Sequence, residues 1–290
     1  MLHVLSIQSH VAYGHVGNAA AVYPLQRLGI EVWPVMTVQF SNHPGYGDFR
    51  GRVLPAAHIA EVIDGLAALG VLQRCDAVLT GYLGEAGSGE AALSVALRVK
   101  AANARAIYLC DPVMGDAESG LFVSEDIPAF MRERALPAAD VVTPNMFELE
   151  TLAGMRVTTI EDTVAAALRL ISTGPGVVLV TSLKHGNTRP GTVEVMAVTT
   201  AGAWRVVTPF LQLEPMPNGA GDALAALFLG YLLKAGNAID AVPRALESSV
   251  AAVFAILEQT GEAGERELQL VAGGDAILSP SRHFAAEALD

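Results

Sequence analysis

The chain has 290 residues, of which 52% are hydrophobic and 17% are charged. This balance argues against long disordered stretches, because disordered chains are poor in apolar residues and rich in charge. The 18 basic and 30 acidic residues give a net charge of −12, with no basic block. Binding to nucleic acid or to an anionic membrane surface is therefore disfavoured, since both require a basic face.

The two cysteines, Cys75 and Cys110, lie far apart and outside any Cys-x-x-Cys pattern. This usage argues against a disulfide framework or a zinc site and favours a reducing cytoplasm. The first residues lack the basic segment and sustained apolar run of a signal peptide. The longest apolar run, within Ala223–Leu233, is too short to span a bilayer. We therefore expect a cytoplasmic protein.

Apolar, strand-like runs alternate with helical patterns along most of the chain. The expected strands are residues 4–7, 31–38, 76–80, 106–110, 140–143 and 177–181. The expected helices between them are residues 18–28, 58–69, 89–103, 145–153 and 160–172. A β-hairpin at 193–199 and 203–207 and two apolar helices at 221–234 and 239–257 follow.

The alternation of strand and helix predicts an α/β fold with a central, mainly parallel sheet and helices on both faces. No internal repeat, low-complexity tract or linker divides the sequence, so we expect one domain over residues 1–290. Ligands of such sheets bind beyond the carboxyl ends of the strands. Polar segments that directly follow strands are therefore the candidates for function.

A glycine-rich turn, Gly219-Ala220-Gly221-Asp222, leads directly into an apolar helix. Backbone N–H groups of the turn and the positive end of the helix form an anion site suited to a phosphate. The carboxylate of Asp222 can accept the proton of an attacking hydroxyl. Taken alone, such a tetrapeptide is more often a capped turn. The catalytic interpretation gains weight because other polar segments also follow strands.

Further carboxylates follow the strands expected at 106–110 and 140–143. Asp111 and Asp116 bracket Pro112–Gly115, and carboxylates in this place suit Mg²⁺, which prefers oxygen ligands. The structural alternative is that Asp111 caps a turn and Asp116 is solvated. Asn145 and Glu148 have the spacing of a helix capping box, which by itself explains them without a catalytic role.

With these residues identified, the sequence resembles the ribokinase superfamily and, within it, the pyridoxal kinases. The resemblance covers nearly the whole chain and is closest in five segments that precede the Gly-Ala-Gly-Asp turn in the family's order. These segments are residues 6–18, 38–46, 80–84, 110–116 and 143–149. The resemblance implies a ribokinase-like fold and ATP-dependent phosphorylation of pyridoxal at its 5′-hydroxyl, with pyridoxine and pyridoxamine as further candidate substrates.

The resemblance also implies a role for individual residues. Asp222 matches the general base, and the amides of Gly219, Ala220 and Gly221 match the anion hole for the transferring phosphoryl group. The positions that match the vitamer pocket are Ser9, Pro44, Gly45 and Tyr82, together with Asp222. Those that match the ATP site are Asp111, Thr143, Asn145, Glu148, Thr181, Ser182, Thr208, Pro209, Phe210 and Leu211.

The implied cofactor is Mg²⁺ bound with ATP, and K⁺ or Na⁺ is a candidate for a second cation. Asp116, Thr143 and Glu148 match the family's cation-binding positions. Three positions depart from the family's pattern: Pro44 and Ala220 replace threonines of relatives, and Thr181 stands where some bacterial relatives have lysine. Lys184 lies three residues beyond Thr181.

Two alternatives to pyridoxal phosphorylation remain at this point. One is a kinase of the same superfamily that acts on hydroxymethylpyrimidine or another small alcohol. The other is a non-catalytic protein that binds pyridoxal 5′-phosphate through the same anion site, which retention of Asp222 argues against. The family is commonly dimeric, so we expect a homodimer whose partners otherwise are ATP and pyridoxal.

Overall fold

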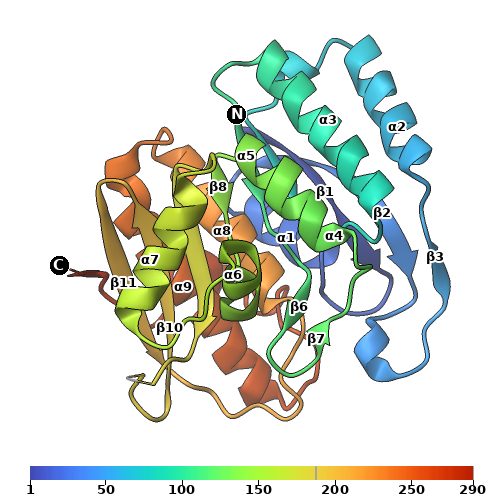
Figure 1. The fold of residues 1–290 in the computed structure, drawn as a ribbon. Coiled ribbons are helices and arrows are strands. Elements are labelled where there is room, and N and C mark those ends of the chain that lie inside the picture. Colours follow the sequence, from blue (N-terminus) through green and yellow to red (C-terminus); the bar gives the residue numbers. More distant parts are fainter. Residues whose placement is uncertain (187, 290) are drawn as a thin grey trace.

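A computed structural model describes residues 1–186 and 188–289. Within these residues, ten strands form one sheet in the order β12-β11-β10-β9-β8-β5-β4-β1-β2-β3 (Figure 1). Its parallel centre consists of β1 (His3–Val11), β2 (Glu31–Phe40), β4 (Ala77–Thr80), β5 (Ile107–Cys110), β8 (Val141–Val142) and β9 (Val177–Leu183). Antiparallel strands at the two edges are β3 (Gly51–Val53), β10 (Thr192–Thr199), β11 (Gly202–Pro209) and β12 (Glu287–Leu289).

Helices cover both faces of the sheet (Figure 1). One face carries α2 (Ala56–Ala68), α3 (Ala86–Ala102), α4 (Ile127–Phe130), α5 (Leu136–Ala138), α6 (Met146–Ala153) and α7 (Ile160–Ile171). The other carries α1 (Asn18–Arg27), α8 (Ala220–Lys234), α9 (Val242–Ala263) and α10 (Gly274–Leu278). Short helical turns are η1 (Pro44–Tyr46), η2 (Leu72–Arg74), η3 (Met131–Ala135) and η4 (Ile239–Ala241), and a separate hairpin joins β6 (Gly115–Asp116) to β7 (Gly120–Leu121).

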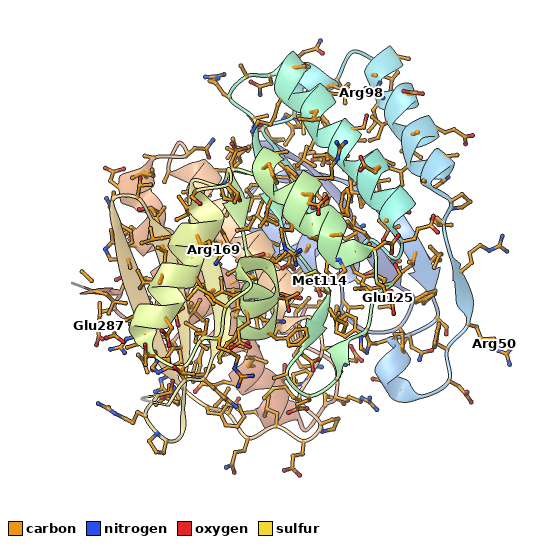
Figure 2. The ribbon with its side chains drawn as sticks, in the orientation of Figure 1. Arg50, Arg98, Met114, Glu125, Arg169 and Glu287 are labelled. Carbon is orange, nitrogen blue, oxygen red and sulfur yellow. The ribbon has the colours of Figure 1, made fainter. Side chains whose placement is uncertain are left out.

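Alternating side chains of the central strands supply both cores. Leu5 and Ile7 of β1 pack into the cluster under α2–α7, whereas Val4 packs into the cluster under α1, α8 and α9. This is the pattern of a parallel strand buried on both faces. Figure 2 shows Arg50 and Glu287 at the outer edge of the molecule, whereas Met114 lies near its middle and is buried.

The predicted fold class is confirmed: the sheet is mainly parallel at its centre, both faces are covered, and the late hairpin forms as β10 and β11. Several elements were missed, namely β3, the β6–β7 hairpin, β12, the helical segment 127–138, α10 and the turns η1 and η2. The strands among them are only two or three residues long. The helical segment contains Pro128 and Pro137 and passes through a π-helical turn, which obscures the helical period.

The helix expected at 239–257 is also longer than predicted, because a 3₁₀ turn leads into α9 and α9 continues to Ala263. None of the helices in residues 1–186 and 188–289 has the length and hydropathy needed to cross a membrane.

Candidate active site

A cavity of about 470 Å³ lies beyond the carboxyl ends of the parallel strands. Three adjacent strands deliver polar residues to it, because Asp111 follows β5, Thr143 follows β8, and Thr181 lies near the end of β9. All residues predicted from the resemblance for the nucleotide line this cavity: Asp111, Thr143, Asn145, Glu148, Thr181, Ser182, Thr208, Pro209, Phe210 and Leu211. Asp116 and the whole turn from Gly219 to Asp222 also line it.

The glycine-rich turn forms the start of α8, as the sequence predicts. Gly219 is the N-cap residue, with a φ of 88° that favours glycine. A β-carbon at this position would also collide with the carbonyl oxygen of His15. Ten residues of α8 between Ala223 and Leu233 are buried and anchor the helix in the core. The first turn of the helix is therefore held rigidly at the cavity. The backbone N–H groups at a helix start have no carbonyl one turn earlier, so those of Ala220 and Gly221 are available to an anion, whereas that of Asp222 contacts its own carboxylate.

Asp222 lies in the first turn of α8 and is partly buried. Burial raises the pKa of its carboxyl to about 6, while hydrogen bonding from the backbone N–H groups of Gly17 and of Asp222 itself lowers it. The group is therefore ionised at neutral pH and yet more basic than an ordinary aspartate. This combination suits a general base that works near pH 7.

Asp111 is buried, and its Oδ1 accepts a hydrogen bond of 2.9 Å from the hydroxyl of Thr143. Burial and the negative charges of Glu148 and Asp222 raise its pKa well above the ordinary value. A cation in the cavity would relieve this repulsion. No group of three His, Cys, Asp or Glu side chains suited to a metal ion occurs in the described residues. Magnesium in nucleotide sites needs only one or two carboxylates besides phosphate and water, so these oxygen donors fit it.

Glu148 completes a capping box at the start of α6. Its Oε2 accepts from the backbone N–H of Asn145 at 2.9 Å, and Asn145 Oδ1 accepts from the N–H of Glu148 at 2.9 Å. Its Oε1 also accepts from the N–H of Met114 at 2.8 Å, so the carboxylate ties α6 to the segment after β5. Burial raises its pKa to about 7, backbone hydrogen bonds lower it, and the charge of Asp116 raises it. The capping interpretation is confirmed.

Asp116 forms a local turn on the wall of the cavity. Its Oδ1 accepts from the backbone N–H groups of Glu118 at 2.9 Å and Ser119 at 2.6 Å. Its Oδ2 accepts from the hydroxyl of Ser119 at 3.3 Å, so the turn orients the carboxylate through both of its oxygens. Its assignment to a cation stays a prediction.

The residues predicted for the vitamer pocket come from neighbouring parts of the same sheet edge. Ser9 is buried in β1, and a β-carbon on Gly17 would collide with its hydroxyl. Tyr82 follows β4, and its carbonyl accepts from the Thr37 hydroxyl at 2.7 Å. Pro44 and Gly45 begin η1.

These vitamer residues do not line the 470 Å³ cavity itself. Asn218 connects the two regions. It lines the cavity, and its Nδ2 would lie 3.8 Å from a β-carbon placed on Gly45.

Two features of the site were not anticipated from the sequence. The ammonium of Lys184 lies 4.3 Å from the centre of the Phe210 ring, and Lys184 is the one basic residue among those that line the cavity. The segment after α9, which carries no recognisable pattern, brings Arg266 and Glu267 to the η1 turn. Only tertiary packing creates these contacts, so no local signal could reveal them.

The parallel sheet, the cavity beyond its strands and the carboxylate at the start of α8 define a ribokinase-like α/β protein. Residues 51–264 match the family model described as phosphomethylpyrimidine kinase. The pyridoxal kinase PdxY of Rubrobacter xylanophilus is 55% identical over 98% of this chain and 96% of its own length. The pyridoxal kinase PdxY of Deinococcus radiodurans is 50% identical over 99% of this chain and 96% of its own length. The chain belongs to the pyridoxal kinase family.

Solved structures agree with this assignment. The pyridoxal kinase of Leishmania donovani in complex with ADP and pyridoxamine superposes with a TM-score of 0.90 at 28% identity and covers 100% of both chains. The complex of that enzyme with ADP and pyridoxine gives a TM-score of 0.89 at 29% identity over 99% of both chains.

The raised pKa of Asp222 predicts that Asp222→Asn stabilises the nucleotide-free protein at neutral pH. The carboxyl has a pKa of about 6 in the folded protein against an ordinary value of 3.8, so folding disfavours its charged form. Below pH 3.8 the carboxyl is protonated in both the folded and the unfolded protein, so the cost of burying its charge vanishes. This cost grows as the pH rises from 3.8 to about 6 and is constant above that pH. The gain above pH 6 should reach about 3 kcal/mol.

Urea unfolding of both proteins at several pH values measures this difference. An Asn variant that is less stable than wild type above pH 6, or a difference that does not shrink toward pH 4, would contradict the assigned environment of Asp222.

Proposed function

We propose that this protein transfers the γ-phosphoryl group of ATP to the 5′-hydroxyl of pyridoxal and so forms pyridoxal 5′-phosphate. The observation that carries the proposal is the position of Asp222, a carboxylate of raised pKa at the start of α8. It lies on the wall of a cavity lined by every residue predicted for the nucleotide. Relatives at 55% and 50% identity over nearly the full chain are pyridoxal kinases, which supports the same substrate here.

In this mechanism Asp222 accepts the proton of the 5′-hydroxyl as the oxygen attacks the γ-phosphorus, while the bond from that phosphorus to the β-phosphate oxygen breaks and ADP leaves. The first backbone N–H groups of α8, at residues 219–221, donate to the phosphoryl oxygens as charge develops on them. Their rigidity comes from the buried body of α8, so little reorganisation accompanies the transfer. Positioning and charge stabilisation supply most of the catalysis, since phosphoryl transfer leaves little covalent chemistry to the protein.

Asp111 and Thr143 are the residues best placed to hold a divalent cation, with Glu148 and Asp116 as further ligands through water. Mg²⁺, when bound with ATP, supplies neutralisation of the phosphate charge. Asp116 with Thr143 is the candidate place for K⁺ or Na⁺. These assignments rest on the oxygen atoms that lie close together after β5 and β8 and could act as metal ligands.

The outer part of the cavity suits the nucleotide. Ser182 lies within β9 on the cavity wall and adopts a left-handed backbone conformation with a φ of 52°, at the point where the register of β9 with β10 shifts. Such a conformation is uncommon for a residue other than glycine and is enriched at functional sites. Thr208–Leu211, at the end of β11, also line the cavity, where the ring of Phe210 is proposed to offer an apolar surface to a base.

Ser9, Pro44, Gly45 and Tyr82 are the proposed pocket for the pyridine ring. We further infer a single domain over residues 1–290 and a cytoplasmic homodimer, for which sedimentation is the direct test. The continuous sheet from β1 to β12 supports the single domain.

A phosphomethylpyrimidine or hydroxymethylpyrimidine kinase is the second candidate function. The family model matched by residues 51–264 is described as phosphomethylpyrimidine kinase, and for hydroxymethylpyrimidine, which is an alcohol, the proton transfer to Asp222 would be the same. Incubation of the purified protein with Mg·ATP and each candidate alcohol separates the two functions. Formation of pyridoxal 5′-phosphate supports our proposal, whereas turnover of the pyrimidine alone overturns it. Tight binding of pyridoxal 5′-phosphate without ATP-dependent turnover would identify a binding protein instead.

Asp222→Asn should lower the turnover of pyridoxal on the order of 10²- to 10⁴-fold, because it removes the proton acceptor. Binding of ATP and pyridoxal should persist, since the amide keeps the size of the side chain. Steady-state kinetics and isothermal titration calorimetry on the same preparation measure both quantities. Undiminished turnover of the Asn variant would reject Asp222 as the base.

Lys184 is proposed to attract the nucleotide phosphates, since it is the one basic residue among those lining a cavity that also contains four carboxylates. Lys184→Met should raise the KM for ATP roughly fivefold, because a single exposed charge contributes at most about 1 kcal/mol. The KM for pyridoxal should change little. The matched control is Lys234→Met at the other end of α8, where the ammonium donates to the carbonyl of Leu28 at 3.2 Å. Equal effects of the two variants on the KM for ATP would contradict the assignment.

A further inference from the structure

One carboxylate after α9 joins two loops that lie far from it in the sequence. Glu267 Oε1 accepts a hydrogen bond of 2.6 Å from the hydroxyl of Tyr46 in η1, a residue 221 positions away. Its Oε2 accepts a hydrogen bond of 2.9 Å from the backbone N–H of His15, 252 positions away. Hydrogen bonds to an ionised carboxylate are shorter and stronger than neutral ones. Glu267 therefore fixes η1 and the 14–17 loop relative to each other.

The neighbouring residue, Arg266, strengthens the contact with η1. Its Nη2 donates to the carbonyl of Gly45 at 2.6 Å, and its guanidinium lies 3.7 Å from the centre of the Tyr46 ring. Burial and the hydrogen bond to Glu267 raise the pKa of Tyr46, so its hydroxyl stays protonated and remains a donor. We call Arg266, Glu267 and Tyr46 the latch.

The 14–17 loop connects the latch to the catalytic turn. A β-carbon on Gly14 would collide with the Glu267 carboxylate, and one on Gly219 would collide with the carbonyl of His15. At the other end of the loop, the backbone N–H of Gly17 favours the charged form of Asp222. The loop is therefore packed between Glu267 on one side and the start of α8 on the other.

The other branch of the latch leads to the proposed vitamer pocket. Tyr46 and Gly45 belong to η1, and the N–H of Gly45 is itself held by Nδ1 of His43 at 3.1 Å. Neither Arg266 nor Glu267 lines the 470 Å³ cavity. A disturbance of the latch should consequently reach the alcohol substrate and the catalytic turn, which lines one part of the cavity, while the nucleotide walls carried by β5, β8, β9 and β11 stay in place.

We propose that Glu267, assisted by Arg266 and Tyr46, is a positioning residue that holds the alcohol-binding segment η1 in register with the loop that supports Asp222. The proposal rests on the proposed kinase function. Its distinguishing property is selectivity: loss of the latch impairs the use of the alcohol and spares the affinity for ATP. A contact that served only the stability of the fold would show no such split.

Three variants test the latch: Glu267→Ala removes both acceptors, Glu267→Gln keeps one, and Tyr46→Phe removes one donor. Glu267→Ala should lower kcat/KM for the alcohol on the order of 10- to 100-fold, since small misplacements of reacting groups are costly. The KM for ATP should stay within about twofold, because the ATP walls are untouched. Glu267→Gln should recover part of the loss, and Glu265→Gln, an exposed neighbour, serves as the matched control.

Combination of Tyr46→Phe with Glu267→Ala adds a test of direct coupling. The double variant should lose less than the product of the two single losses, because the two side chains share one hydrogen bond. Thermal unfolding identifies any variant that is not folded. If Glu267→Ala does not fold, Tyr46→Phe, which removes only one oxygen, still tests the latch. A rise in the KM for ATP as large as the rise in the KM for the alcohol, or an unchanged alcohol KM and kcat in Glu267→Ala, would overturn the proposal.

Hydrogen exchange separates failure of the latch from failure of the proposed function. Peptides that cover residues 12–18 and 43–48 should exchange faster in Glu267→Ala than in wild type, whatever alcohol the enzyme uses. If wild type phosphorylates a different alcohol, the pyridoxal assignment fails and the same kinetic ratios are measured with that alcohol. Unchanged exchange in both peptides would show that Glu267 does not hold the loops, which overturns the latch alone.

Discussion

The negative charge of Asp222 is held at the start of α8 by two opposed influences, and the rest of the site depends on their balance. Burial disfavours the charge, whereas the backbone N–H groups of Gly17 and of the helix start favour it. The result is a carboxylate that is ionised near neutrality and still basic. The same helix start offers its free N–H groups to a phosphoryl group, so the proton acceptor and the anion site are parts of one turn.

This arrangement is destabilising by itself, and the surrounding fold compensates for it. Burial and the negative charges of Glu148 and Asp222 raise the pKa of Asp111, and burial and the charge of Asp116 raise that of Glu148. Two apolar cores, one on each face of the sheet, offset the loss of stability that this cluster of buried carboxylates causes. Backbone contacts such as those of Glu148 with Asn145 and Met114 keep the crowded carboxylates in place.

The sequence predicted those features that follow from local patterns. Asp111 comes directly after an apolar strand, Asn145 and Glu148 have capping spacing, and Asp222 precedes an apolar helix, so their meeting at one sheet edge follows from the parallel topology. The pocket positions Ser9 and Tyr82 were available only through resemblance. Elements of two or three residues, and contacts such as that of Glu267 with Tyr46, escaped prediction. Such features are set by tertiary packing over sequence separations as large as 221 residues.

The pH dependence of kcat/KM for pyridoxal tests the central claim most directly, with Asp222→Asn as the reference for protons that belong to the substrates. Because the pKa of Asp222 is about 6, the wild-type value should fall about tenfold per pH unit below that pH. This acid limb should be absent from the residual activity of Asp222→Asn. An acid limb that is identical in the two proteins would show that another group accepts the proton.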